Sequence, residues 1–264
     1  MTEENPESQL SEQPEQTQAE QDAGLKRTSK LGRGIYLLPN LFTTASLFSG
    51  FYAIVAGMNG HFDNAAVAIF VSMVLDGLDG RVARMTNTQS AFGAEYDSLV
   101  DMVAFGVAPA LVAFSLNLQF LGNLGWIATF IYVAGAALRL ARFNTQIGSV
   151  DKRYFVGLPS PSAAALVAGF VWVTHNYEPS TFLTILTVIV VAAAGVLMVS
   201  NVLYLSFKDF DMKRRVPFTA VLIMVMVFAV IALEPAFVLL CGFVIYVLSG
   251  PFNTFVLRKK RKLD

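Results

Sequence analysis

Four aspartates lie inside apolar stretches of the sequence. Asp76 and Asp79 belong to the segment MVLDGLDGRVARM, and Asp97 and Asp101 belong to AEYDSLVDMVAF. Placing a carboxylate at the centre of a bilayer costs about 3 kcal/mol or more, so such groups are functional candidates. If each stretch is a helix, both aspartates of a pair lie on one face, because residues three or four positions apart are neighbours there.

Four carboxylates that face one cavity repel each other unless a divalent cation lies among them or some are protonated. Oxygen ligands without nearby His or Cys suit Mg²⁺ or Mn²⁺ better than Zn²⁺. Small residues at Gly77, Gly80, Ala83 and Gly93 leave the helix backbones open to a large polar ligand. Arg84 adds a fixed cation suited to phosphate. These features together predict a phosphoryl-transfer site.

Each of these features also has a purely structural interpretation. Small residues in a GxxxG-like spacing are common where membrane helices pack together, and a single intramembrane aspartate can pair with a nearby Arg. The structural interpretation is weakest for the four aspartates taken together, because the spans carry no equal number of cations to pair with them.

The composition indicates an all-α integral membrane protein. Of the 264 residues, 55% are hydrophobic and only 14% are charged, whereas soluble domains carry about 25% charged residues. A hydrocarbon core about 30 Å thick is crossed by roughly 20 apolar helical residues. This length predicts eight spans, at residues 36–58, 64–85, 98–116, 124–144, 160–174, 181–204, 217–233 and 235–256.

The distribution of positive charge supports this topology. All 19 Lys and Arg residues precede the first span or lie around the ends of the second, fourth, sixth and eighth, and none lies on the other four connections. By the positive-inside rule, both termini are cytoplasmic, and the aspartates open to the same side. We therefore expect a multi-pass protein of the cell (inner) membrane.

Charge and cysteine content exclude other classes. The 19 acidic residues balance the 19 basic ones, which argues against a nucleic-acid partner. Cys241 is the only cysteine, so the chain has neither a disulfide framework nor a cysteine metal cluster. Residues 1–34 are predicted to form a disordered, acidic cytoplasmic tail with a basic end. Residues 257–264 are predicted to form a basic cytoplasmic tail.

The residues from Asp76 to Asp101 form the pattern D-x2-D-G-x2-A-R-x8-G-x3-D-x3-D. This pattern resembles the signature of the CDP-alcohol phosphatidyltransferase family at all eight specified positions. The resemblance implies a six-helix transmembrane core, here residues 35–210, with residues 211–256 as two additional helices, and usually a homodimer. It also implies a CDP-linked lipid donor, whose pyrophosphate is attacked by an alcohol while CMP leaves.

The resemblance also implies roles for individual residues. Asp76, Asp79, Asp97 and Asp101 would bind divalent cations, Mg²⁺ or Mn²⁺, two per site, and Asp101 would also act as the general base. The CDP group of the donor, CDP-diacylglycerol, would be bound by a set of small, polar and charged residues from three helices: Asn40, Thr43, Asp76, Gly80, Ala83, Arg84 and Gly93.

The acceptor alcohol is indicated by two other stretches, RLARFN (139–144) and FVGLPSPSAA (155–164). They resemble the phosphatidylserine-forming branch of the family, which implies L-serine as the acceptor. The carboxylate of serine needs a cation, which Arg139 or Arg142 could supply. Pro159 and Pro161 would leave Ser160 and Ser162 available at the start of the fifth span.

Two alternatives remain open at the level of sequence. Within the family, the acceptor could be glycerol 3-phosphate or inositol phosphate, each of which needs more cations for its phosphate. Outside the family, clustered intramembrane carboxylates are also found in ion transporters. Such transporters commonly contain two related halves, whereas here the second half of the chain has no counterpart of the aspartate motif.

Overall fold

The computed structural model of the chain describes residues 38–145, 154–178, 180–205 and 218–260. The predicted acidic tail at residues 1–34 and the last residues of the predicted basic tail lie outside this part of the chain. Nearly all described residues are helical, and two three-residue strands form the remaining regular structure.

The elements follow one another as long helices with short connections. In chain order they are the first helix (Leu38–Met58), α2 (Phe62–Met85), α3 (Ala91–Asp101), a π-helical segment (Met102–Val107), α4 (Ala108–Leu116), a 3-10 turn (Leu118–Leu121), α5 (Asn123–Thr145), β1 (Tyr154–Val156), α6 (Ser160–Thr174), α7 (Thr181–Val199), β2 (Leu203–Leu205), α8 (Phe218–Leu233) and α9 (Pro235–Lys260).

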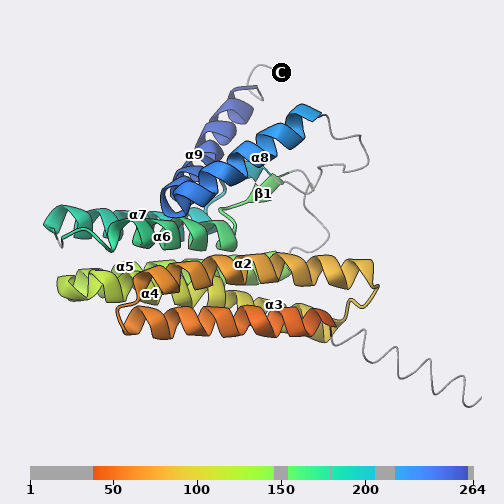
Figure 1. Cartoon of the computed structure of the whole chain (residues 1–264), viewed down its shortest axis with the longest axis horizontal. Helices are drawn as coiled ribbons and strands as arrows, with labels where there is room; N and C mark the ends of the chain where they lie inside the picture. The colour runs from red at the N-terminus through yellow and green to blue at the C-terminus, as the bar shows by residue number, and fades with distance from the viewer. Residues whose placement is uncertain (1–37, 146–153, 179, 206–217, 261–264) are drawn as a thin grey trace, which may run out of the picture.

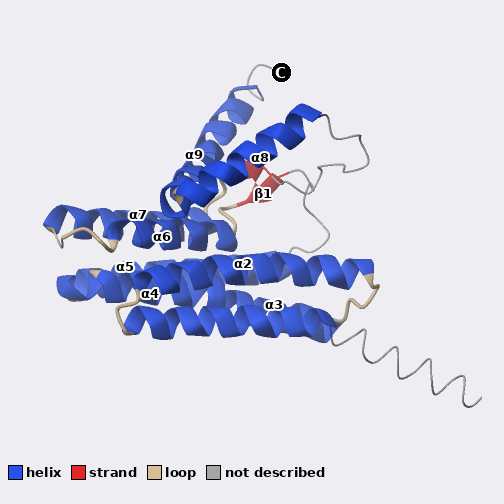
Figure 2. Ribbon diagram, viewed as in Figure 1, coloured by secondary structure: helices blue, strands red, loops and turns tan. Residues whose placement is uncertain are grey.

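The helices are arranged in layers. The first helix, α2, the continuous rod formed by α3 and α4, and α5 lie nearly along one direction, and α6 and α7 form a second layer over them (Figure 1). α8 and α9 cross above α6 and α7 at a steep angle. The antiparallel pair β1 and β2 lies close to this crossing (Figure 2). The six helical rods that precede α8 therefore form one body, onto which the last two helices pack.

All eight predicted helical spans are present, but two of their bounds were wrong. The third begins at Ala91 rather than residue 98, because the Ser90 hydroxyl accepts a hydrogen bond from Gly93 N at 3.0 Å and caps the helix. The sixth ends at Val199 rather than residue 204, and the chain then forms β2. This hairpin was not predicted.

The outer surface identifies a multi-pass membrane protein. Among the described residues, five helices are long and apolar enough to cross a membrane: Leu38–Met58, Ala91–Leu116, Asn123–Thr145, Thr181–Val199 and Pro235–Thr254. α2 has 24 residues but carries several charges, while α6 and α8 are shorter. Large apolar side chains such as Phe48, Phe120 and Phe182 are more than 70% exposed, as expected where the solvent is lipid.

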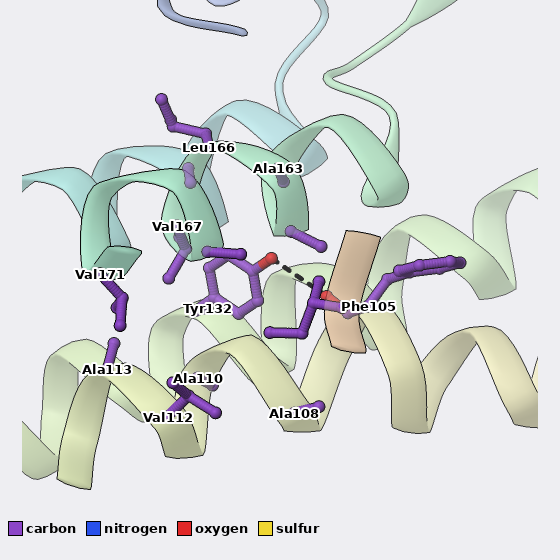
Figure 3. Packing of buried hydrophobic residues seen from close by; sticks show 14 of the residues in the cluster. Phe105, Ala108, Ala110, Val112, Ala113, Tyr132, Ala163, Leu166, Val167 and Val171 are labelled. Atoms are coloured by element: carbon purple, nitrogen blue, oxygen red, sulfur yellow. Dashed lines mark hydrogen bonds between the residues drawn. The ribbon is translucent and has the colours of Figure 1, made fainter. Parts of the chain in front are cut away.

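The interior is built mainly from small side chains. Alanines from every rod from the first helix to α7 are almost fully buried, and Gly135 on α5 meets the backbone of Gly195 on α7, where no Cβ could fit. Small residues let membrane helices approach closely. Among the described residues, the largest fully buried side chains are Tyr132 and Tyr204. Tyr132 lies among residues of α4 and α6 (Figure 3).

Candidate active site

Three of the four aspartates converge between α2 and α3. One carboxylate oxygen from each of Asp76, Asp97 and Asp101 lies within 4.8 Å of the other two. All three residues are partly buried. Helical spacing thus brings together three carboxylates that are up to 25 positions apart in the sequence, whereas the sequence predicted that all four aspartates share one cavity.

The chemistry of this cluster fits a divalent cation. Asp97 Oδ1 and Asp101 Oδ1 are buried and find no hydrogen-bond partner among the described residues. A buried carboxylate oxygen without a partner carries a large desolvation cost, which a hard cation with oxygen ligands would remove. The residues present therefore fit a hard divalent cation with oxygen ligands.

Asp79 occupies a different position from the other three aspartates. Its side chain is buried, and its Oδ2 accepts a 2.7 Å hydrogen bond from Thr43 Oγ1 on the first helix. Asp79 also lines the adjoining pocket, as does Asp97. The first helix therefore fixes one acid of the motif at the boundary between the carboxylate cluster and the pocket.

The pocket beside the cluster has a volume of about 310 Å³. It is enclosed by the start of the first helix, the end of α2, the connection to α3 and the start of α3. Its lining is Pro39, Asn40, Thr43, Asp79, Gly80, Ala83, Arg84, Thr88, Gln89, Ser90, Gly93, Ala94 and Asp97. Of the residues predicted to bind the CDP group, the pocket contains all except Asp76, which lies in the neighbouring carboxylate cluster.

The glycines of α2 leave space rather than bring helices together. A Cβ added at Gly80 would find no atom closer than Arg84 Nη1 at 4.0 Å, and one added at Gly77 would find none within 4 Å. By contrast, a Cβ at Gly50 would lie 2.8 Å from the Ala104 Cα. Helix packing therefore accounts for Gly50 but not for Gly77 or Gly80, and Gly80 opens α2 to the pocket.

The connection between α2 and α3 is shaped by local backbone chemistry. Asn87 adopts a positive φ of 52°, a conformation that Asn tolerates better than most residues. The Thr86 and Thr88 hydroxyls lie 2.7 Å apart, and Ser90 caps α3. This tight turn places Thr88, Gln89 and Ser90 in the pocket wall.

The predicted acceptor residues are only partly brought together. Arg139 Nη1 on α5 donates to Ser160 Oγ at 2.8 Å, at the start of α6, and Arg139 is close enough to Asp101 for their charges to interact. Ser162 is half-buried in the first turn of α6. Arg142 instead points to the end of α7, where it donates to Asn201 Oδ1 at 2.9 Å.

The carboxylate cluster, its pocket and the nearby Arg139 all lie in the part of the chain that precedes α8. A family model described as CDP-alcohol phosphatidyltransferase matches residues 36–200, which include every one of these groups. The chain belongs to the CDP-alcohol phosphatidyltransferase family. The matched part of this family member ends just after α7, so α8 and α9 lie outside it.

Curated relatives narrow the comparison within the family. A protein of Helicobacter pylori named CDP-diacylglycerol--serine O-phosphatidyltransferase is 41% identical over 80% of this chain and 90% of its own length. Proteins with the same name from Methanocaldococcus jannaschii and Saccharomyces cerevisiae are 36% identical over 67% of this chain and 40% identical over 51% of it. The aligned regions cover 78% of the Methanocaldococcus jannaschii protein and 53% of the Saccharomyces cerevisiae protein.

Some residues around this phosphatidyltransferase site were missed from sequence. Thr88 and Gln89 line the pocket, but they belong to a connection whose path the helical pattern does not specify. Ala94 also lines the pocket, from the part of α3 that precedes the predicted start of the third span at residue 98. Ser98 Oγ accepts a 3.1 Å hydrogen bond from Asn144 Nδ2, next to the aspartates of α3. Ser90 could have indicated the start of α3, because a Ser that precedes a helix is a common N-cap.

Proposed function

We propose that this chain transfers the phosphatidyl group of CDP-diacylglycerol to the hydroxyl of L-serine, giving phosphatidylserine and CMP. The observation that carries the proposal is the adjacency of three features: the carboxylate cluster, a pocket of about 310 Å³ with Arg84 in its wall, and Arg139 close to Asp101. The serine-using names of the relatives support the choice of acceptor.

Each part of the site has a role in this reaction. The pocket residues Asn40, Thr43, Gly80 and Arg84 hold the CDP group, with the Arg84 guanidinium next to phosphate. Two divalent cations, Mg²⁺ or Mn²⁺, held by the aspartates would neutralise the pyrophosphate and the charge that develops on the leaving group.

The acceptor is activated on the side of the cluster that faces Arg139. The Asp101 carboxylate takes the proton of the serine hydroxyl as its oxygen bonds to the lipid-side phosphorus, and the bond from that phosphorus to the CMP oxygen breaks. Arg139, oriented by Ser160, pairs with the carboxylate of serine. Ser162 and Arg142 are secondary candidates for the same substrate, since no hydrogen bond among the described residues joins either of them to the Arg139–Ser160 pair.

We also propose the placement and assembly of the protein. Both termini and the site face the cytoplasm of the inner membrane, which the one-sided distribution of 19 Lys and Arg residues supports. Residues 35–210 form the catalytic core and 211–256 two additional helices, in agreement with the family match at 36–200. A homodimer is the assembly that the family resemblance implies.

The acceptor is tested by incubating the purified protein with labelled CDP-diacylglycerol and Mn²⁺. Serine, glycerol 3-phosphate and inositol phosphate are supplied in turn, and lipid product and CMP are measured. We expect phosphatidylserine with serine only, and no product when the cation is removed. A product formed with one of the phosphorylated alcohols but not with serine would contradict the proposal, and ion flux in liposomes without CMP release would favour a transporter.

The base is tested with Asp101→Asn. Loss of a general base lowers turnover by about 10²–10⁴-fold, so we expect a fall of this size in CMP release while the protein remains folded. Asp63→Asn, an exposed aspartate at the opposite end of α2, is the matched control and should retain activity. Near-normal CMP release by purified Asp101→Asn would exclude Asp101 as the base.

A further inference from the structure

The rod that carries Asp97 and Asp101 changes its helical geometry directly after Asp101. Residues Met102–Val107 form a π-helical segment, and the N–H of Ala108 donates to Val103 O, five residues back. π-helical turns are rare in proteins and are found mostly at functional sites. Here the wide turn joins the half-rod that carries the aspartates to α4, which is packed in the core.

A proline explains why the turn is wide. In an α-helix Phe105 O would accept from the N–H of residue 109, but residue 109 is Pro, which has no N–H and whose ring collides with that carbonyl. The Phe105 carbonyl is instead bonded by Tyr132 on α5, whose hydroxyl donates to it at 3.0 Å (Figure 3). Tyr132 is fully buried, so this bond is made away from solvent.

The wide turn also sets how α3 and α4 face the first helix. Ala104 packs on Gly50 and Val112 packs on Gly57, so a step of seven residues on the first helix corresponds to eight on the other rod. In a continuous α-helix, residues eight apart point about 80° away from each other. The extra residue of the wide turn changes the angle between Ala104 and Val112 by about 100°, so both residues face the first helix.

The direction of the Asp97 and Asp101 side chains depends on the rotation that the π-helical turn introduces. If α4 kept its contact with Gly57 while the turn reverted to α-helix, the half-rod that carries Asp97 and Asp101 would rotate by about 100°. Both carboxylates would then leave the cluster with Asp76. The orientation of two members of the cluster therefore depends on the geometry of Met102–Val107.

We propose that Tyr132 is a positioning residue of the active site: its hydroxyl holds the π-helical segment in the register that directs Asp97 and Asp101 toward Asp76. Ala136, one turn further along α5, lies against Gly106 in the same segment, where an added Cβ would lie 3.1 Å from its Cβ. A single face of α5 thus supports the wide turn and continues to Arg139. The inference rests on the proposed function only for its kinetic effect.

The test removes the hydroxyl but keeps the ring, in Tyr132→Phe. We expect Mn²⁺, measured by titration of the purified protein without lipid substrate, to bind about tenfold or more weakly, as when the partner of a metal ligand is lost. Turnover should fall with KM for serine nearly unchanged, since Arg139 and its hydrogen bond to Ser160 lie outside the half-rod that moves. Tyr204→Phe is the matched control: it also loses a bond from a buried hydroxyl to a backbone carbonyl, at Val247, but should bind Mn²⁺ normally.

A second variant, Pro109→Ala, restores the missing N–H and allows an ordinary α-helical turn. A purely structural role for the segment predicts a stabilised protein with unchanged metal affinity, because Ala favours helix over Pro. The proposal predicts weaker Mn²⁺ binding without loss of stability. Normal Mn²⁺ affinity in both Pro109→Ala and Tyr132→Phe would overturn it. Because this readout uses no lipid, it stands even if the wild type fails to make phosphatidylserine, which would contradict only the proposed function.

Discussion

Gly80 shows how much one missing methyl group can matter in this site. A Cβ at this position would enter the pocket, with no atom nearer than Arg84 Nη1 at 4.0 Å. The sequence alone left open whether the small residues of α2 serve helix packing or ligand approach. The empty surroundings of Gly80, which lines the pocket, favour ligand approach there, since a glycine needed for packing has neighbours at its Cβ position, as Gly50 does.

We therefore expect Gly80→Ala to weaken donor binding without harming the fold. KM for CDP-diacylglycerol should rise about tenfold, the effect of a loss of 1.4 kcal/mol, while unfolding becomes slightly harder because Ala favours helix over Gly by up to about 1 kcal/mol. Gly77→Ala makes the same change outside the pocket lining and should gain stability with an unchanged KM. Equal KM values for the two variants would show that Gly80 does not border the bound nucleotide.

Arg139 and Arg142 make a second contrast between single residues. The sequence indicated that either arginine could bind the carboxylate of serine. In the structure, Arg139 donates a hydrogen bond to Ser160, whereas Arg142 donates to Asn201. We expect Arg139→Gln to raise KM for serine by about 10–100-fold, because hydrogen bonds to charged groups contribute roughly 1.5–3 kcal/mol. Arg142→Gln should have a clearly smaller effect in the same assay. A larger rise in KM for serine in Arg142→Gln than in Arg139→Gln would indicate that serine binds near the end of α7.

At the scale of elements, the sequence predicted the helices well and their irregular joints poorly. Long apolar runs with basic residues at alternate ends define spans by length and charge alone. The π-helical segment was not predicted, because Pro109 lies inside an apolar run and its consequence depends on Tyr132 from another helix. The hairpin was missed for a similar reason: β1 and β2 have three residues each, too few for alternation to show.

The aspartate cluster could be predicted because its chemistry lies in one contiguous motif. Helical spacing places Asp76 on one face of α2, and Asp97 and Asp101 on one face of α3, and a short turn makes the two helices neighbours. The acceptor side could be predicted only in part, since the path from α5 to α6 and the direction of Arg142 depend on tertiary contacts. Asp79 is intermediate: its helix face was predictable, whereas its bond to Thr43 required the position of the first helix.

The hairpin connects the last helix to the start of α6. β2 pairs with β1, which ends three positions before Pro159 and four before Ser160. α9 holds β2 through Thr254 Oγ1, which accepts a hydrogen bond from Leu203 N at 2.8 Å. Tyr204 of β2 lies directly against Gly250 of α9. α9, beyond the family match, is thereby linked through the hairpin to the residue that orients Arg139.

We expect Gly250→Ala to affect serine rather than the lipid donor. The added methyl group collides with the Tyr204 ring, and overpacking of this kind costs about 1–3 kcal/mol, so the hairpin should shift and KM for serine should rise while KM for CDP-diacylglycerol stays nearly constant. Gly242→Ala lies on the same helix with no atom within 4 Å of the new Cβ and is the matched control. If Gly250→Ala changed stability alone, α9 would have no influence on the acceptor side.

At the scale of the whole molecule, the balanced net charge conceals a local imbalance. The chain has 19 acidic and 19 basic residues, yet three carboxylates meet between α2 and α3. Repulsion among them opposes the packing of the two helices in a low-dielectric interior. A bound divalent cation reverses this effect, so the stability of the bundle and the occupancy of the site should be linked.

We therefore expect the melting temperature of the purified protein to rise with Mn²⁺ and fall with a chelator. A cation that binds only the folded state at 100 times its dissociation constant stabilises it by about 2.7 kcal/mol. In the double variant Asp97→Asn/Asp101→Asn the shift should be lost, and without metal this variant should melt above the wild type, because the repulsion is removed. Asp63→Asn, at the far end of α2, should keep the full shift.

An equal rise in melting temperature with Mn²⁺ in the double variant would place the stabilising cation outside the aspartate cluster. A metal-free double variant that melts below the wild type would show that the carboxylates hold α2 and α3 together by some other means.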